Sequence, residues 1–431
     1  MNSKLKTFSY IAIILLFISI AIPIYQDSQI KDFTNEDDEY EARKQLEIKN
    51  STITGFKDGK LSWRIKANYI WTTSSKYLFR AEKIISGDLF DNDGVNVITD
   101  LYAEQIRVNS NSKTLSAYEN IMATFLRRLK NNLETNKIYG KEPDTKSVKI
   151  TADELRYFSL SKKTYLYDNI TIKQKNTLIY PKKEVQVDND KNIAYVQHGF
   201  NLNSKEYVVS GNKMVIYIDD DYSEMSGNIF AKRKAKPTTN MTLDKRERDM
   251  RSKPTYLTCE YMKYTNKDDN DEVNIFGNIH IYQGNRVIKG DKGLFNKQKN
   301  YYQIEGNVVF QAPDLIWLLN KNKNFQNQDI AKSIKMNVKI TADKMSFDSD
   351  KKRIEMTGNV KFTQSDKTIT CKKLIYKDDK EELTLMGAIN IIKDKNEKLK
   401  CHYLVLNLQD ESFFADKGIK TEFTVKKNKE N

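Results

Sequence analysis

A chain of 431 residues with 39% hydrophobic and 11% aromatic residues can bury a core, and only six prolines and 16 glycines argue against a disordered or collagen-like chain. The 72 Lys and Arg against 58 Asp and Glu give a net charge of +14, which favours anionic partners. Basic residues are scattered, and zinc-finger, basic-zipper and RNA-binding signatures are absent from the sequence, so we expect no nucleic-acid partner.

The first element is an apolar segment near the N-terminus. Residues 8–25 are broken only by Ser9, Ser19 and Pro23, and at about 1.5 Å per residue they nearly span the roughly 30 Å core of a bilayer. Lysines precede the segment and acidic residues follow it, so the positive-inside rule places residues 1–7 in the cytoplasm. We expect a transmembrane anchor and then a polar linker over 26–45. A signal peptide cleaved after Ala21 is the alternative.

A repeated pattern fills the rest of the chain. Residues 150–153 and 340–343 both read Ile-Thr-Ala-Asp, and an Asn followed by Ile or Val comes 16 residues after each Asp. Nine such units can be counted, eight of them with the same spacing, and the residue after the second position is always apolar. The first and second positions are Glu104 and Asn120, Asp153 and Asn169, Lys183 and Gly199, Asn212 and Asn228, Glu260 and Asn278, Asp291 and Asn307, Asp343 and Asn359, Lys372 and Ala388, and His402 and Gly418.

Each unit has the alternation of two half-buried strands. Apolar and polar residues alternate with period two, and Asp- and Asn-rich turns separate the runs. The Gly-Asn step inside the second strand predicts a bulge or bend. Such units build two facing sheets around an apolar interior, with roughly 18 to 20 strands in all and about ten in each sheet. Polar inserts at 124–147, 235–255 and 312–338 are expected to be loops at one end of the stack.

The sequence gives no sign of catalysis. It has no nucleophile elbow, zinc-protease motif, phosphate loop or paired-cysteine motif, and we expect a protein that is not an enzyme and needs no cofactor or metal. Cys259, Cys371 and Cys401 all directly precede a first repeat position, where other units have Ala or Gly. This placement predicts that the thiols fill a small buried site.

The repeat resembles a known family. The Ala-Asp-x-[Leu/Met]-x-[Tyr/Phe] and Gly-Asn-[Val/Ile] frame over 101–423 resembles the OstA-like lipopolysaccharide-transport periplasmic proteins of the LptA and LptC type. Residues 46–130, with Gly55, the run 63–67 and the segment 77–86, are similar to LptC. Residues 148–425 are similar to LptA, with inserts near 235–255 and 312–338.

The resemblance implies an all-β fold, an elongated open β-jellyroll whose apolar interior holds acyl chains. It also implies a single-pass inner-membrane protein with its body in the periplasm. The implied partners are lipopolysaccharide or a related glycolipid, an inner-membrane ABC exporter, and sister OstA-like proteins or an outer-membrane translocon that pair with edge strands. The implied function is a lipid-transfer bridge component that passes the glycolipid toward the outer membrane.

Equivalent apolar residues of the units are the candidate lipid-binding residues. For each of them a dry core is the alternative, and for the whole chain the alternative is an anchored periplasmic scaffold that binds no lipid. The candidates are Leu155, Ile170, Ile172, Met262, Ile279, Ile281, Val308, Phe310, Met345, Val360, Phe362, Leu374, Ile389 and Ile391.

Overall fold

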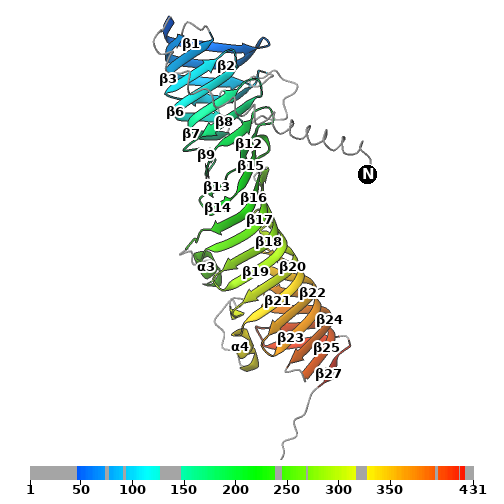
Figure 1. The fold of residues 1–431 in the computed structure, drawn as a ribbon. Helices are drawn as coiled ribbons and strands as arrows, with labels where there is room; N and C mark the ends of the chain where they lie inside the picture. Colours follow the sequence, from blue (N-terminus) through cyan, green and yellow to red (C-terminus); the bar gives the residue numbers. More distant parts are fainter. Residues whose placement is uncertain are drawn as a thin grey trace, which may run out of the picture.

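The computed structural model consists almost entirely of antiparallel strands stacked along an elongated body, as the repeat predicts (Figure 1). It describes residues 46–72, 77–90, 94–126, 147–237, 245–267, 270–316, 328–393, 397–416 and 418–422. The expected tail, anchor and linker over 1–45 lie outside these residues. Within the described ranges, no helix has the length and apolar character needed to cross a bilayer.

The strands follow one another with short turns. The first part comprises β1 (Leu46–Lys57), β2 (Lys60–Thr72), β3 (Leu78–Phe90), β4 (Asn96–Tyr102), β5 (Gln105–Asn109), β6 (Thr114–Phe125) and β7 (Val148–Phe158). The middle part has shorter strands, β8 (Lys163–Tyr167), β9 (Thr171–Gln174), β10 (Thr177–Pro181), β11 (Val185–Asp188), β12 (Ile193–Val196), β13 (Phe200–Asn203), β14 (Tyr207–Gly211) and β15 (Lys213–Tyr217), then a 3-10 turn (Ile218–Asp220) and β16 (Tyr222–Arg233).

The C-terminal part has long strands and two short helices. It comprises α3 (Lys245–Ser252), β17 (Thr255–Lys267), β18 (Asn270–Gln283), β19 (Arg286–Asn296), β20 (Tyr301–Ala312), α4 (Gln328–Ile334), β21 (Val338–Asp348), β22 (Arg353–Gln364), β23 (Lys367–Lys377), β24 (Glu382–Lys393), β25 (Glu397–Asn407), β26 (Ser412–Asp416) and β27 (Lys420–Glu422). Both helices lie in predicted inserts and project from the same side of the stack (Figure 1).

A bend at the second repeat position shapes every unit. All nine second positions have a positive φ, from 40° at Ala388 to 95° at Gly199, and the strand register shifts there, for example between Thr357 and Val360. Asn tolerates this conformation, and its side chain reaches back to the first position of the same unit. Asn359 Nδ2 donates to Asp343 Oδ2 at 3.0 Å, two other units repeat this Asn-to-Asp bond, and Asn278 Nδ2 donates to Glu260 Oε1 in a fourth unit. The predicted bulge is confirmed, and the 16-residue spacing reflects this contact.

The bends divide the stack into two layers. We call layer A the strand halves that carry Phe310 and Phe362, and layer B those that carry Ile304 and Met345. Each long strand crosses the bend and pairs in both layers, so β20 pairs with β21 through 308–312 in layer A and through 301–305 in layer B. The expected ten strands per sheet is therefore wrong, because nearly every long strand contributes to both sheets.

One row of apolar residues runs across each layer in register. In layer A, residues directly opposite one another on successive strands are Ala123, Ile150, Ile172, Ile179, Leu202, Val209, Ala231, Leu257, Ile281, Ile288, Phe310, Ile340, Phe362, Ile369, Ile391 and Leu399. Cross-strand packing of such pairs is what stabilises a sheet. The apolar interior therefore continues through the whole stack.

Small residues occupy the narrow space beside the bends. Cys259, Cys371 and Cys401 lie opposite Ile229, Val360 and Ile389, and Gly290 lies opposite Ile279 in the same way. A Cβ added to Gly290 would come within 2.3 Å of Ile304 Cγ2, so only a small side chain fits there. All three thiols are free and buried, which confirms their prediction as small fillers.

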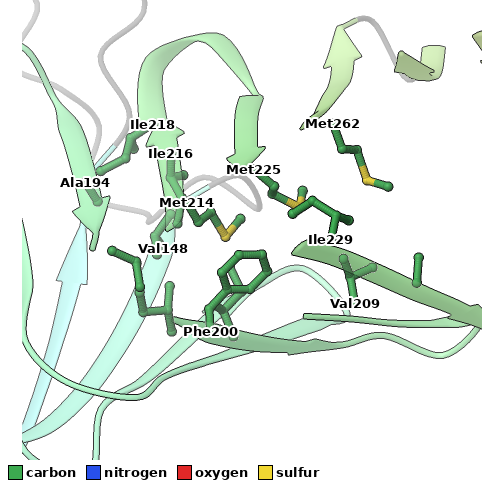
Figure 2. Packing of buried hydrophobic residues seen from close by; sticks show 14 of the residues in the cluster. Val148, Ala194, Phe200, Val209, Met214, Ile216, Ile218, Met225, Ile229 and Met262 are labelled. Carbon is green, nitrogen blue, oxygen red and sulfur yellow. The ribbon is translucent and has the colours of Figure 1, made fainter. Parts of the chain in front are cut away.

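The interior is closed by packing. Figure 2 shows Met214, Met225 and Met262 of layer B pointing toward Phe200 and Val209 of layer A, and these five side chains are 0 to 8% exposed. The expected open jellyroll therefore needs correction: the two layers close on each other around a dense core, since interdigitated side chains leave few voids. The antiparallel, nearly all-β architecture is confirmed, with the described strands joined into one continuous sheet that folds into the two layers.

Each end of the stack is formed by edge strands. β1 pairs with β2 alone, and β26 and β27 both pair with β25. Large apolar side chains are exposed at both ends, including Phe56 at 60% and Phe413 at 69%. An unpaired strand edge is a template for pairing with another chain.

Strand pairing also continues from β6 to β7, across the predicted boundary between residues 130 and 148.

Candidate functional site

The side of the stack opposite the bends, where the ends of the two layers meet, is the candidate site, and we call it the seam. In the N-terminal third, hydrogen bonds join the layers across the seam. Lys162 Nζ and Tyr157 Oη of layer B both donate to the Phe90 carbonyl of layer A, at 3.3 and 3.2 Å. Asn192 Nδ2 donates to the Leu126 carbonyl at 3.1 Å.

A fourth hydrogen bond also joins the two layers, because Ser62 Oγ of layer A lies 2.9 Å from Ser159 Oγ of layer B. Lys162 is 1% exposed, and Asn192, Ser62 and Ser159 are 2 to 3% exposed, so water does not compete for these bonds. We call these contacts the clasp. It holds the seam shut over the first third of the stack.

Beyond residue 255 the seam has a different character. Most of the outer inward-facing side chains there are only half-buried, although they pack against the core, whereas Phe310, Ile340 and Tyr376 in the same register are buried. In layer A the half-buried side chains are Leu257, Ile281, Ile288, Phe362, Ile369, Ile391 and Leu399, and in layer B they are Tyr264, Val273, Phe295, Ile354, Leu383 and Leu406.

Tyr302 and Phe347 of layer B are each 37% exposed and stack on one another at 5.9 Å between ring centroids. They lie in register between Phe295 and Ile354. Two facing bands of half-exposed apolar side chains thus follow the C-terminal seam. Each band offers apolar surface to a ligand that can separate the layer ends.

The structure places all fourteen predicted lipid-binding residues on the inward faces. Eleven of them are buried, with exposures from 0% at Leu155 to 8% at Met345, and these form the dense core. Ile281, Phe362 and Ile391 are half-buried in the seam band of layer A. Contact with lipid stays a prediction for all fourteen, and these three are placed best to make it.

The sequence analysis did not identify the seam band of layer B. Phe295 and Phe347 come two residues before a turn and Tyr302 two residues after one, where an aromatic residue resembles a strand end with no special role. The sequence feature that could have identified this band is the recurrence of a large apolar residue at that place in successive units. Periodicity alone does not separate it from the core positions two residues further in.

A cavity of about 400 Å³ lies at the N-terminal end of the stack, next to the clasp. Its walls include Trp63 of layer A, Phe79 of layer B and the paired hydroxyls of Ser62 and Ser159. Its size is in the range of small-ligand sites. No local pattern in the sequence indicates this cavity, because its walls come from four strands and two turns.

The histidines and carboxylates of the described residues show no shared chemistry. His198 contacts Glu184 at 2.9 Å and His280 packs against Tyr282 at 5.6 Å, while His402 lies beside Gly418. In the described part of the chain, no three His, Cys, Asp or Glu side chains are grouped as metal ligands. Two aromatic and ionic clusters, around Glu154 and Glu224, lie on the outward face of layer B.

We expect the three thiols to be nearly inert in the folded protein. Burial raises the pKa of Cys259 and of Cys371 to about 11, and it also raises the pKa of Cys401, so little reactive thiolate exists at pH 8. A disulfide reagent should titrate all three thiols rapidly only in denaturant. Because folding favours the protonated thiols, their contribution to stability is present below the unfolded pKa and is lost as pH rises toward 11. Rapid reaction of native protein at pH 8 would contradict this burial.

Part of the chain is similar to a known family. Residues 260–382 and 339–409 match the model described as LptA/(LptD N-terminal domain) LPS transport protein. No curated protein matches the chain. Among solved structures, the crystal structure of LptH from Pseudomonas aeruginosa, described as the LptA homologous periplasmic component of the conserved lipopolysaccharide transport device, is 11% identical, covers 32% of this chain and 94% of its own, and has a TM-score of 0.24.

Proposed function

We propose that the chain binds a lipopolysaccharide-type glycolipid between its two layers and passes it along the stack. The proposal is supported by residues 260–409, which match the model described as LptA/(LptD N-terminal domain) LPS transport protein. The matched segment is also where the half-exposed seam bands lie. The proposal concerns transfer without catalysis. Acyl chains would separate the layer ends and pack between them, while the sugar headgroup stays in water.

The half-exposed seam bands are the observation that carries this proposal. A core that served stability alone gains by burying its side chains fully, as in the N-terminal third, where Ile172 and Ile179 of the same row are 1 and 2% exposed. Covering the exposed remainder of Phe362 or Ile391 with an acyl chain releases about 25 cal/mol per Å² of apolar surface. The gain recurs along two stretches of the row, from Leu257 to Ile288 and from Phe362 to Leu399, which the buried Phe310 and Ile340 separate.

Equivalent rungs favour movement over tight fixation at one point. Ile281 and Ile288 lie opposite one another, as do Phe362 and Ile369, and Ile391 and Leu399. Each pair presents two large apolar side chains to the seam at the same depth. A ligand shifted by one rung therefore exchanges one such pair for another, which suits a conduit better than a storage site.

The proposal extends to location and partners. The apolar segment over 8–25 would anchor the chain in the inner membrane with the stack in the periplasm, and residues 46–130 would play the part of an LptC-like start. The exposed edges at β1 and at β26 and β27 would pair with an inner-membrane ABC exporter complex at one end. Sister OstA-like proteins or an outer-membrane translocon would pair at the other end.

The dense packing of the interior favours a second candidate, an anchored scaffold that binds no lipid. Eleven of the fourteen candidate residues are buried and would be fully used in holding the stack together. The scaffold explains the clasped N-terminal third well. It does not explain why large apolar side chains remain half-exposed along both layers after residue 255.

A binding experiment with matched variants separates the two candidates. The full chain in detergent should bind purified lipopolysaccharide, and Ile281→Asp with Phe362→Asp and Ile391→Asp should weaken binding at least about tenfold, because each charge would have to be desolvated by the acyl chains. The control carries Asp at His280, Lys361 and Asn390, the neighbours that face outward. Absence of binding by the unchanged chain would favour the scaffold, as would equal binding by both variants.

A further inference from the structure

The seam-side rim of layer A changes from apolar to cationic where the half-exposed band begins. Strand alternation places Arg233, Thr255, Gln283 and Arg286 on the inward face, each two residues beyond a member of the apolar row. Arg233 lies opposite Thr255 and Gln283 opposite Arg286. Both arginines are half-buried. This rim is therefore polar and positive directly beside Leu257, Ile281 and Ile288.

The insert that carries α3 adds to this rim. Arg233 Nη2 donates to the Met250 carbonyl and to Thr255 Oγ1, both at 3.3 Å, and the Lys236 amide donates to the Arg251 carbonyl at 2.8 Å. Gln283 Nε2 donates to the same Met250 carbonyl at 3.0 Å. The end of α3 is thus fixed against β16 and β18. Arg251 and Lys253 follow the bonded carbonyls and are exposed.

Neighbouring cations lie on other parts of the surface. Lys232 lies over the Tyr256 ring at 5.6 Å on the outward face. Lys234 Nζ donates to Asn203 Oδ1 at 2.7 Å, and Lys236 pairs with Glu206, whose pKa is lowered chiefly by that hydrogen bond. Arg233 and Arg286 lie on the inward face beside the apolar band. A simpler account is that Arg251 and Lys253 only compensate the carbonyl end of α3.

We propose that Arg233, Arg251, Lys253 and Arg286 bind the phosphate groups of a glycolipid whose acyl chains lie along Leu257, Ile281 and Ile288. Arginine matches the geometry of a phosphate with two parallel hydrogen bonds, and such charge-assisted bonds are among the strongest available to a surface. The apolar row and the cationic rim together fit an amphiphile with a phosphorylated head. This inference rests on the proposed function and adds that the rim recognises the negative charge of the headgroup.

The test compares two ligands and two variants of the full chain. A bisphosphorylated lipid A and the same glycolipid without phosphates are titrated into unchanged protein and into Arg251→Gln with Lys253→Gln and Arg286→Gln. The control variant carries Gln at Lys289, Lys361 and Lys400, which are exposed on the outward face of layer A. Arg233 is left unchanged because it also fixes α3. Inorganic phosphate serves as a competitor.

Unchanged protein and the control should prefer the phosphorylated ligand about tenfold, and the rim variant should lose that preference while keeping its affinity for the unphosphorylated ligand. Equal binding of both ligands by unchanged protein overturns the inference and leaves the proposed function standing. Displacement by inorganic phosphate at micromolar concentration overturns it too, because the rim would then act without the apolar row. If unchanged protein binds neither ligand, the proposed function fails and the inference fails with it.

Discussion

A photo-crosslinking residue at Phe362 should label a glycolipid in cells, whereas the same residue at Lys361 should label little or none. Phe362 is half-buried in the seam band of layer A, and Lys361 is the exposed neighbour on the same strand that points outward. A strand turns successive side chains to opposite faces, so the two probes differ in direction and share nearly the same position in the stack. The expected ratio of lipid adducts is therefore large.

The comparison extends along the seam. Ile281 and Ile391 lie in the same row as Phe362, and their outward neighbours are His280 and Asn390. All three inward sites should yield adducts of one mass, since a ligand that moves along the stack passes each of them. Adducts at Phe362 alone would indicate a fixed site in place of a conduit. Equal labelling at Phe362 and Lys361 would remove the seam from the proposal, and labelling of protein alone would favour the scaffold.

The repeat was readable from the sequence because one local contact enforces it. A bend needs a residue that accepts a positive φ, and Asn359 both accepts it and bonds to Asp343 sixteen residues earlier. The same requirement holds at Asn169 and Asn307, so residue type and spacing recur together. Small residues before the first position recur for an equally local reason, the narrow space beside the bend.

The alternation of inward- and outward-facing residues does not show where a strand passes from one layer to the other. Inward-facing residues of β20 are Tyr302, Ile304, Val308, Phe310 and Ala312, and all have even numbers. The two-residue bend at 306 and 307 keeps this parity, so the alternation continues unbroken while the strand passes from layer B to layer A. Period two therefore predicts inward and outward faces correctly and cannot reveal how many layers one strand serves.

Burial at the seam depends on contacts between distant residues, which a local pattern does not encode. Lys162 stands in a Ser-Lys-Lys turn that is typical of solvated surface, yet it bonds a carbonyl 72 residues away and is 1% exposed. Ile281 and Ile172 occupy equivalent places in the same row and differ in burial. The sequence thus predicted which side chains face inward, and contacts between distant residues decided which of them are fully buried.

Loss of the Lys162 side chain should open the N-terminal seam. Lys162→Ala removes a fully buried stem and the bonds from Nζ to the Phe90 carbonyl and to Tyr157 Oη, each 3.3 Å long. A large-to-small change in a packed site lowers the free energy of unfolding by about 2–4 kcal/mol, and this range includes the loss of the two hydrogen bonds. The matched control is Lys163→Ala on the next residue, which is half-exposed and should cost less than about 0.5 kcal/mol.

Hydrogen exchange is the suitable measurement, because a long repeat stack need not unfold in one step. In Lys162→Ala, amides of 86–90 and 157–164 should exchange about 30 to 700 times faster, while amides beyond residue 255 keep their protection. The Asn189 amide, which donates to the Lys162 carbonyl, should report the same opening from the layer B side. Uniform acceleration along the whole chain would show that Lys162 supports global stability and is no local clasp. Unchanged exchange at 86–90 would show that Tyr157 alone holds the Phe90 carbonyl, and that the seam there stays closed without the lysine.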